Sequence, residues 1–376
     1  MNYDEKRLFS LDMLRGLDMI FLTVVAPLIM AVDAVWGLPK GVVHFMVTHP
    51  WEGFTAYDLI MPLFLFMCGA AIPLSLERRL EKNDGRPDAA YWKHVIWRFV
   101  MLWVLGLVVQ GRLLSLNLDK IRLYDNTLQT IAAGYLVCAI TVALTQKLWI
   151  KIAIPAACFT VYGVLLHALG DYSTTGNFAF KVEKTILEAI VPATSETMSE
   201  LTSDTKDMLE VHYTWYLTSL MFVFMAFAGY FATKILQSQA AQWVRARRLA
   251  VYGAVMLAAG WLLALAGVRM VKHIFTVSFT AQAMGWCALL LAALYVITDI
   301  WKLRRGLGLC ILFGQFALTA YLTEFFCPVM EKFAEMFVGG VPHLIGTDAY
   351  QRIFVAVFVV AETVAVLAIR RRLKQR

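Results

Sequence analysis

Long apolar segments separated by short polar ones dominate this sequence. A helix needs about 20 mostly apolar residues to cross the hydrocarbon core of a membrane. Read for such segments, the chain predicts a bundle of about ten transmembrane helices, an all-α polytopic membrane protein in one domain over residues 1–376. The predicted spans are 16–35, 57–76, 94–111, 127–146, 148–169, 214–236, 248–268, 274–298, 306–327 and 351–370.

The composition supports this interpretation. Apolar residues make up 60% of the chain and charged residues only 16%, which is more apolar surface than a soluble core of this size could bury. Membrane lipid is therefore the expected surrounding of most of the chain.

Lysine and arginine gather in short clusters that fall in alternate connections. Such clusters mark the cytoplasmic side of a membrane protein. With ten spans, both termini are predicted to be cytoplasmic, in a bacterial inner membrane. The acidic connection 171–213 is predicted to be an extracytoplasmic loop between spans five and six. The net charge of +7 comes from these clusters, so it indicates orientation and not a nucleic-acid partner.

The six cysteines lie in or beside apolar segments, with no CxxC and no histidine at ligand spacing. This pattern predicts small buried side chains, with neither a disulfide framework nor a metal site.

His49 and Asp58 stand directly before the second apolar segment. Ionisable groups at a membrane boundary lose solvation, and they commonly have a function. A histidine beside a carboxylate is also a simple general base. The alternatives are that His49 is an interfacial histidine next to Trp51 and that Asp58 or Thr55 caps the following helix.

Other polar residues fall at the predicted outer ends of distant spans. We expect them to line a pocket in the outer half of the bundle. They are Arg112, Asn126, Gln129, Lys272, His273 and Glu324.

Asp12, Arg15 and Asp18 lie near the predicted inner end of span one. A spacing of three residues places them on one helical face. They are either a structural ladder of charges or a site where the Arg15 guanidinium faces an anionic group. Gln315 in span nine is interpreted as a hydrogen-bond partner between helices.

Several blocks of the sequence resemble the heparan-α-glucosaminide N-acetyltransferases of the wider transmembrane acyltransferase group. SLDMLRG at 10–16 resembles the family's S-x-D-x-x-R-G, and WEGFTAYDLIMPLFLFMCG at 51–69 resembles W-x-G-x-T-x-x-D-L-x-x-P-x-F-x-F-x-x-G. Segments 120–132, 272–278 and 314–321 follow in family order. The family's histidine usually stands three residues before the tryptophan, whereas His49 stands two before. Thr130, His273 and Gln315 also differ from the family's residues.

The resemblance implies acetyl transfer from cytoplasmic acetyl-CoA to an amino sugar of the glucosamine type on the other face. His49, oriented by Asp58, would take the acceptor's proton or carry the acetyl group. Acceptor or oxyanion contacts would come from Asn126, Gln129, Lys272, His273 and Glu324, and donor contacts from Asp12, Arg15, Gln315 and Ser278. A homodimer is also implied. The alternatives are a carrier for an amino sugar that transfers no acyl group, and a structural membrane protein.

Overall fold

The computed structural model describes residues 8–48, 50–111, 113–116, 122–190, 213–325, 327–338, 340–341 and 351–375. Every regular element in these ranges is a helix, which confirms the predicted all-α class. Nine of the described helices are long and apolar enough to cross a membrane. They are Phe9–Trp36, Tyr57–Lys82, Ala89–Val109, Thr127–Leu144, Leu148–Leu169, Ser219–Gln237, Gln242–Leu265, Val277–Ile300 and Gln351–Leu373.

The predicted span 306–327 differs from the other nine. It consists of two short helices, α15 (Gly308–Gln315) and α16 (Ala317–Phe325), which are separated at Phe316. Phe316 leaves the helical conformation, with φ −120° and ψ 31°. At 1.5 Å per residue each helix is shorter than about 15 Å, roughly half of a hydrocarbon core. Neither helix is long enough to cross a membrane alone.

The predicted loop 171–213 contains an additional helix, α9 (Phe178–Ile190). Residues 191–212 of that loop lie outside the described residues.

The described chain forms two compact units. The first comprises the described residues up to 48, residues 55–60, and those from 290 onward. The second comprises residues 50–54 and the described residues between 61 and 289. The prediction that residues 1–376 act as one domain stays a prediction.

In the first unit, α1 packs against α15 at a pair of glycines. A Cβ atom on Gly16 would lie 1.9 Å from the backbone oxygen of Cys310, and one on Gly314 would lie 1.9 Å from that of Asp12. Small residues at such crossings let two helix backbones approach closely. Besides α15 and α16, the unit contains α1 (Phe9–Ile20), η2 (Phe21–Val25), α2 (Ala26–Trp36), α3 (Lys40–Val47), η3 (Tyr57–Leu59), η7 (Val296–Ile300), α17 (Cys327–Val338) and α19 (Gln351–Gln375).

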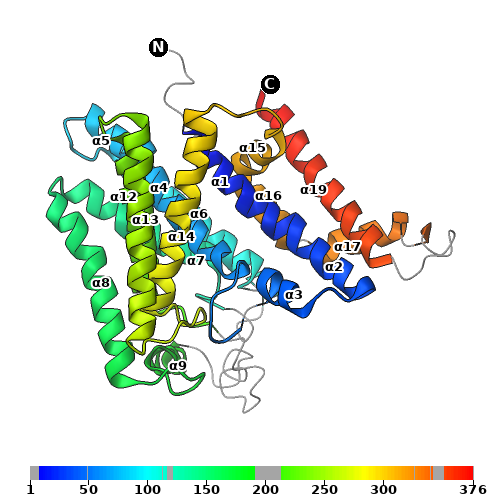
Figure 1. The fold of residues 1–376 in the computed structure, drawn as a ribbon, viewed down its shortest axis with the longest axis horizontal. Helices are drawn as coiled ribbons and strands as arrows, with labels where there is room; N and C mark the ends of the chain where they lie inside the picture. Colours follow the sequence, from blue (N-terminus) through cyan, green and yellow to red (C-terminus); the bar gives the residue numbers. More distant parts are fainter. Residues whose placement is uncertain are drawn as a thin grey trace. The chain divides into compact units, whose positions relative to one another are not determined.

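The second unit is arranged around α12 (Ser219–Gln237), which packs against α7, α8 and α13 (Figure 1). A Cβ atom on Gly69 would lie 1.7 Å from the Ala226 oxygen, and one on Gly229 would lie 1.8 Å from the Phe66 oxygen. α12 therefore meets α4 at a second close glycine crossing. The other helices are α4 (Ile60–Ile72), η4 (Pro73–Glu77), α5 (Arg78–Lys82), α6 (Ala89–Val109), η5 (Leu113–Ser115), α7 (Thr127–Leu144), α8 (Leu148–Leu169), α9, α13 (Gln242–Leu265) and most of α14 (Val277–Tyr295).

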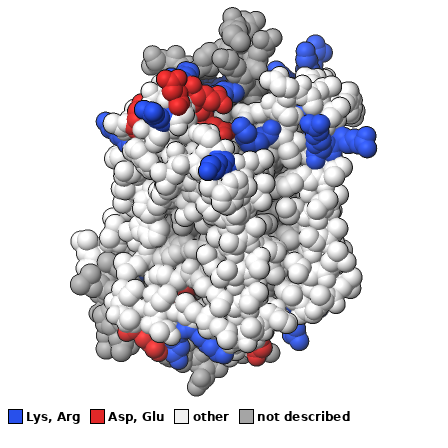
Figure 2. All heavy atoms as spheres, turned by 90° about the vertical axis from the view of Figure 1, so that its left-hand side faces the viewer, with Lys and Arg blue, Asp and Glu red and all other residues white. Residues whose placement is uncertain are grey.

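Charged side chains gather at two opposite ends of the molecular face drawn in Figure 2, and the broad band between them is almost entirely uncharged. A surface of this kind suits a bilayer, whose core does not solvate charge. The chain is thus a polytopic membrane bundle. Which end faces the cytoplasm, and in which membrane, stay predictions.

Candidate functional site

The turn between α13 and α14 carries Lys272 and His273, and it is closed by its own hydrogen bonds. The Phe275 N–H donates to the Lys272 oxygen (2.9 Å), and the Thr276 N–H donates to the Val271 oxygen (3.1 Å). The Thr276 hydroxyl in turn accepts the Val271 N–H (3.0 Å). Lys272 and His273 are 5% and 2% exposed, so both side chains are held inside the unit.

Ser278 ties the turn to the start of α14. Its hydroxyl donates to the Arg269 oxygen at 2.9 Å and lies 3.2 Å from the Thr276 hydroxyl. The sequence resemblance predicts that Ser278 contacts the acetyl donor, acetyl-CoA. In the structure its described contacts hold the turn in place.

Phe275 adopts a backbone conformation that is rare for a bulky residue. Its φ is +43° and its side chain is fully buried. The ring packs edge-on against Phe222 at 5.1 Å, and the Phe275 oxygen accepts the Thr280 hydroxyl at 3.1 Å. Such strain persists only where the surroundings enforce it, and it is concentrated at functional sites. The turn is therefore a site candidate on geometry alone.

His273 lies between two aromatic rings from other segments. Trp51 stacks on it with ring centroids 5.2 Å apart, and Tyr213 packs against it at 4.5 Å. Trp51 is held by a hydrogen bond from its indole nitrogen to the Tyr172 oxygen (2.9 Å). The His273 oxygen accepts the Thr214 N–H at 3.1 Å. We refer to Trp51, Tyr213 and His273 as the aromatic slot.

The aromatic slot continues to the start of α7. Tyr213 contacts Trp215 at 5.6 Å between ring centroids, and the Trp215 indole donates to Asp125 at 2.7 Å. The other oxygen of Asp125 accepts Arg122 at 2.7 Å. Segments near residues 51, 125, 214 and 273 thus meet at one end of the second unit. Of the polar segments that the sequence predicts to converge, the described contacts link the start of α7 and the turn at Lys272 and His273, through Tyr213 and Trp215. The roles of these residues stay predictions.

Asn126 and Gln129 bind each other at the N-terminus of α7. The Asn126 side-chain oxygen accepts the Gln129 N–H (3.1 Å), and its amide donates to the Gln129 side chain (2.9 Å). Gln129 also accepts the Asp125 N–H (2.9 Å) and donates to the Leu123 oxygen (2.7 Å). Asn126 is therefore a helix N-cap. The side-chain amides of Asn126 and Gln129, which the sequence resemblance assigns to contacts with the sugar acceptor or the oxyanion, therefore take part in bonds within the protein.

Glu183 on α9 is a buried carboxylate that the sequence interpretation missed. It is 1% exposed and accepts the backbone N–H groups of Trp215 and Tyr216, each at 3.0 Å. Burial raises its pKa from the usual 4.5 to about 7. The sequence does contain a pattern that indicates its burial. Glu183 lies four residues after Ala179 and four before Leu187, so it shares one helical face with two apolar residues.

Asp58, in the first unit, is fully buried at the start of the helix Tyr57–Lys82. Its carboxylate accepts the backbone N–H and the hydroxyl of Thr55, both at 2.9 Å. The Thr55 hydroxyl also lies 3.1 Å from the Thr48 oxygen. Asp58 thus binds the segment ahead of its helix, and the residue at the N-cap, Ala56, forms no side-chain capping bond, so the capping role that the sequence left open is not seen here. His49 lies outside the described residues, so its pairing with Asp58 stays a prediction.

Asp12 and Arg15 form an ion pair at 3.6 Å on α1, and Asp18 is 4% exposed one turn later. Gln315 is the last residue of α15. Glu324 lies in α16, but its side chain, like all of Arg112, lies outside the described part of the chain.

Among the described residues, no group of three or more His, Cys, Asp or Glu side chains could hold a metal ion.

A comparison with curated proteins finds human heparan-alpha-glucosaminide N-acetyltransferase, 27% identical over 144 residues. The aligned segment covers 38% of this chain and 20% of the human protein, so the chain matches about a fifth of that relative's length. No family model matches the chain. The comparison indicates a distant relationship to a transferase, carried here on a bundle of apolar helices.

Proposed function

We propose that this chain is a membrane-embedded acetyltransferase that moves an acetyl group from cytoplasmic acetyl-CoA to the amino group of an amino sugar. The observation that carries the proposal is the similarity to the human N-acetyltransferase over 144 residues. The strained turn that carries Lys272 and His273 supports it, because Trp51 and Tyr213, which come from two segments distant in sequence, pack against this turn.

The reaction joins the acceptor nitrogen to the acetyl carbon and breaks the carbon–sulfur bond of the thioester. A base must take a proton from the amine, and the proton ends on the departing thiolate of coenzyme A. We assign the base to His49 and its orientation to Asp58. A carboxylate offers about four acceptor positions, so Asp58 can bind Thr55 and still orient a histidine.

The tetrahedral intermediate carries a negative oxygen that needs a hydrogen-bond donor or a cation. We assign this role to Lys272, which lies in the strained turn between α13 and α14. Asn126 is the weaker candidate, since both ends of its amide group bind Gln129. His273 in the aromatic slot is assigned to acceptor binding, and Arg15 to the phosphates of coenzyme A.

The test uses the full-length purified protein with radiolabelled acetyl-CoA and glucosamine. The His49→Ala variant is expected to lose at least about a hundredfold in kcat. His44→Ala is the matched control, because His44 is exposed and bonds only to Thr48 among the described residues. His273→Asn carries the residue typical of the family and is expected to raise KM for the acceptor more than it lowers kcat.

Two outcomes would change the proposal. If His273→Asn abolishes turnover while His49→Ala keeps it, the base is His273. If the protein neither acetylates nor binds coenzyme A, but carries glucosamine into proteoliposomes, it is a carrier and not an enzyme.

A further inference from the structure

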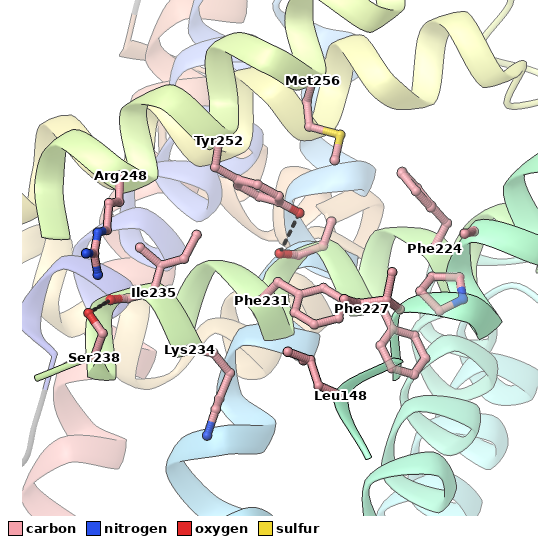
Figure 3. A pocket seen from close by; sticks show the side chains of 14 residues that line it. Leu148, Phe224, Phe227, Phe231, Lys234, Ile235, Ser238, Arg248, Tyr252 and Met256 are labelled. Carbon is pink, nitrogen blue, oxygen red and sulfur yellow. Dashed lines mark hydrogen bonds between the residues drawn. The ribbon is translucent and has the colours of Figure 1, made fainter. Parts of the chain in front are cut away.

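An apolar groove runs along α12 in the second unit, and none of the residues that line it belongs to the aromatic slot. Its volume is about 630 Å³. Phe224, Phe227 and Phe231 of α12 form its floor (Figure 3). α8 contributes Pro155 and its neighbours to one wall, and α13 contributes Met256 and its neighbours to the other. Both outer helices pack against α12, so the groove is a furrow between them.

The groove has the depth of one membrane leaflet. Its lining on α12 runs from Phe224 to Ile235, a rise of about 17 Å at 1.5 Å per residue, and Ser238 just past the end of the helix also lines it. This is about half of the hydrocarbon core. The Lys234 end lies where α12 ends at Gln237 and where α8 and α13 begin, so it faces the membrane boundary.

The boundary end of the groove is positively charged. Lys234 is paired with Glu77 at 3.0 Å, but Glu77 is also paired with Lys151 at 3.3 Å, so two lysines share one carboxylate. Arg248 lies at the same end (Figure 3), is exposed, and forms no ion pair with any described residue. The charge at this end is complementary to an anion.

Two exposed tryptophans stand beside the boundary end. Trp149 in the first turn of α8 is 66% exposed, and Trp243 in the first turn of α13 is 57% exposed. Tryptophan is enriched at the level of lipid headgroups. The charge pattern of the sequence predicts this end to be cytoplasmic, where anionic lipids gather.

We propose that this groove binds an anionic phospholipid, with the phosphate at Lys234 and Arg248 and one acyl chain over the phenylalanines of α12. The mostly apolar lining suits an acyl chain better than the pantetheine arm of coenzyme A, whose amides need hydrogen-bond partners. The hydroxyl of Tyr252 already donates to the Ala228 oxygen at 3.3 Å, and that of Ser238 donates to the Ile235 oxygen at 2.8 Å. The inference does not depend on the acetyltransferase function.

Native mass spectrometry of the delipidated full-length protein tests the headgroup contact. Phosphatidylglycerol is expected to bind more tightly than phosphatidylcholine with the same chains. Arg248→Glu should weaken phosphatidylglycerol binding by at least about fivefold, the weight of one basic residue. Arg247→Glu is the matched control, because Arg247 is also exposed on α13 but does not line the groove. Equal affinity for the two lipids, or equal losses in the two variants, would overturn the proposal.

A second pair of variants tests the acyl chain. Ala156→Trp places a large ring in the groove, whereas Ala157→Trp places it on an exposed neighbour outside the lining. Only Ala156→Trp should lose the bound phosphatidylglycerol. Thermal melting in detergent verifies that each variant is folded. Retention of the lipid by folded Ala156→Trp would show that the groove is not its site.

Discussion

The two ends of α12 hold polar groups in opposite ways. Near its C-terminus, Tyr230 and Lys234 join Glu77 and Lys151, so that one buried carboxylate is bound by two lysines and a hydroxyl, with the Tyr230 hydroxyl 2.8 Å from Glu77. Before its N-terminus, Glu183 is bound by two backbone N–H groups and no cation is within ion-pair distance in the described chain. The first arrangement joins helices to one another. The second fixes non-helical segments, which is what the positioning of reactive groups requires.

The largest expected effect comes from removing the carboxylate at the C-terminal end of α12. Glu77→Leu leaves Lys151 buried without its counter-charge and should destabilise the second unit by about 3–5 kcal/mol. The unfolding temperature in detergent measures this. Adding Lys151→Met to Glu77→Leu should recover most of the loss, because the uncompensated charge is removed. If the single variant melts like the parent, the ion cluster does not hold these helices.

A somewhat smaller effect is expected at the other end. Glu183→Ala leaves the N–H groups of Trp215 and Tyr216 without acceptors, at a cost of about 2–4 kcal/mol. Glu183→Gln keeps a carbonyl oxygen at the same place and should stay within about 1 kcal/mol of the parent. The melting temperature in detergent measures both effects. Equal destabilisation in the two variants would contradict the assigned hydrogen bonds.

The same residue predicts a pH dependence. The folded protein holds a proton on Glu183 up to a pKa of about 7, whereas the unfolded chain releases it near 4.5. The resulting contribution to stability is fully present below pH 4.5 and is lost as the pH rises through about 7, on the order of 1–3 kcal/mol. Melting curves of the parent and of Glu183→Gln at pH 5 and pH 8 test the sign. The stability of the parent relative to the variant should fall at the higher pH, and an unchanged or reversed difference would refute this.

The smallest effect is expected on the exposed face of α9. Lys184 and Glu188 lie 4.0 Å apart, with side chains 42% and 51% exposed. Such pairs contribute about 0.5 kcal/mol or less. Lys184→Ala should therefore leave the melting temperature unchanged within error. A shift as large as that of Glu183→Ala would mean that exposed and buried faces of α9 are equally important.

The sequence predicts the helices well because a span of apolar residues has few other solutions in a membrane. It also contains the local cap from Asn126 to Gln129, although the interpretation assigned those residues to substrate. The break at Phe316 was missed because Leu312, Phe313 and Ala317 continue the apolar pattern across it. Hydropathy does not register a change of backbone angle.

The aromatic slot lies beyond sequence reasoning for another reason. Trp51, Tyr213 and His273 are more than 50 residues apart and come together only through the packing of three connections. Glu183 was missed because the composition was considered over all of residues 171–213, and the acidic character of that whole segment suggested a solvated loop. A window of one helix would have separated its buried face from its charged one.

The glycine crossing of α4 and α12 sets an order of events during synthesis. Gly69 and Gly229 must both be present before the two helices can approach to the distance that their missing side chains allow. At roughly 5–20 residues per second, the ribosome needs about 8–32 s to add the intervening chain. During that interval α4 has no α12 to pack against, and Glu77 lacks its contacts with Tyr230 and Lys234. The assembly of this protein therefore includes a period in which the glycine face of α4 is not yet covered by α12. That period lengthens with every residue inserted between the two glycines.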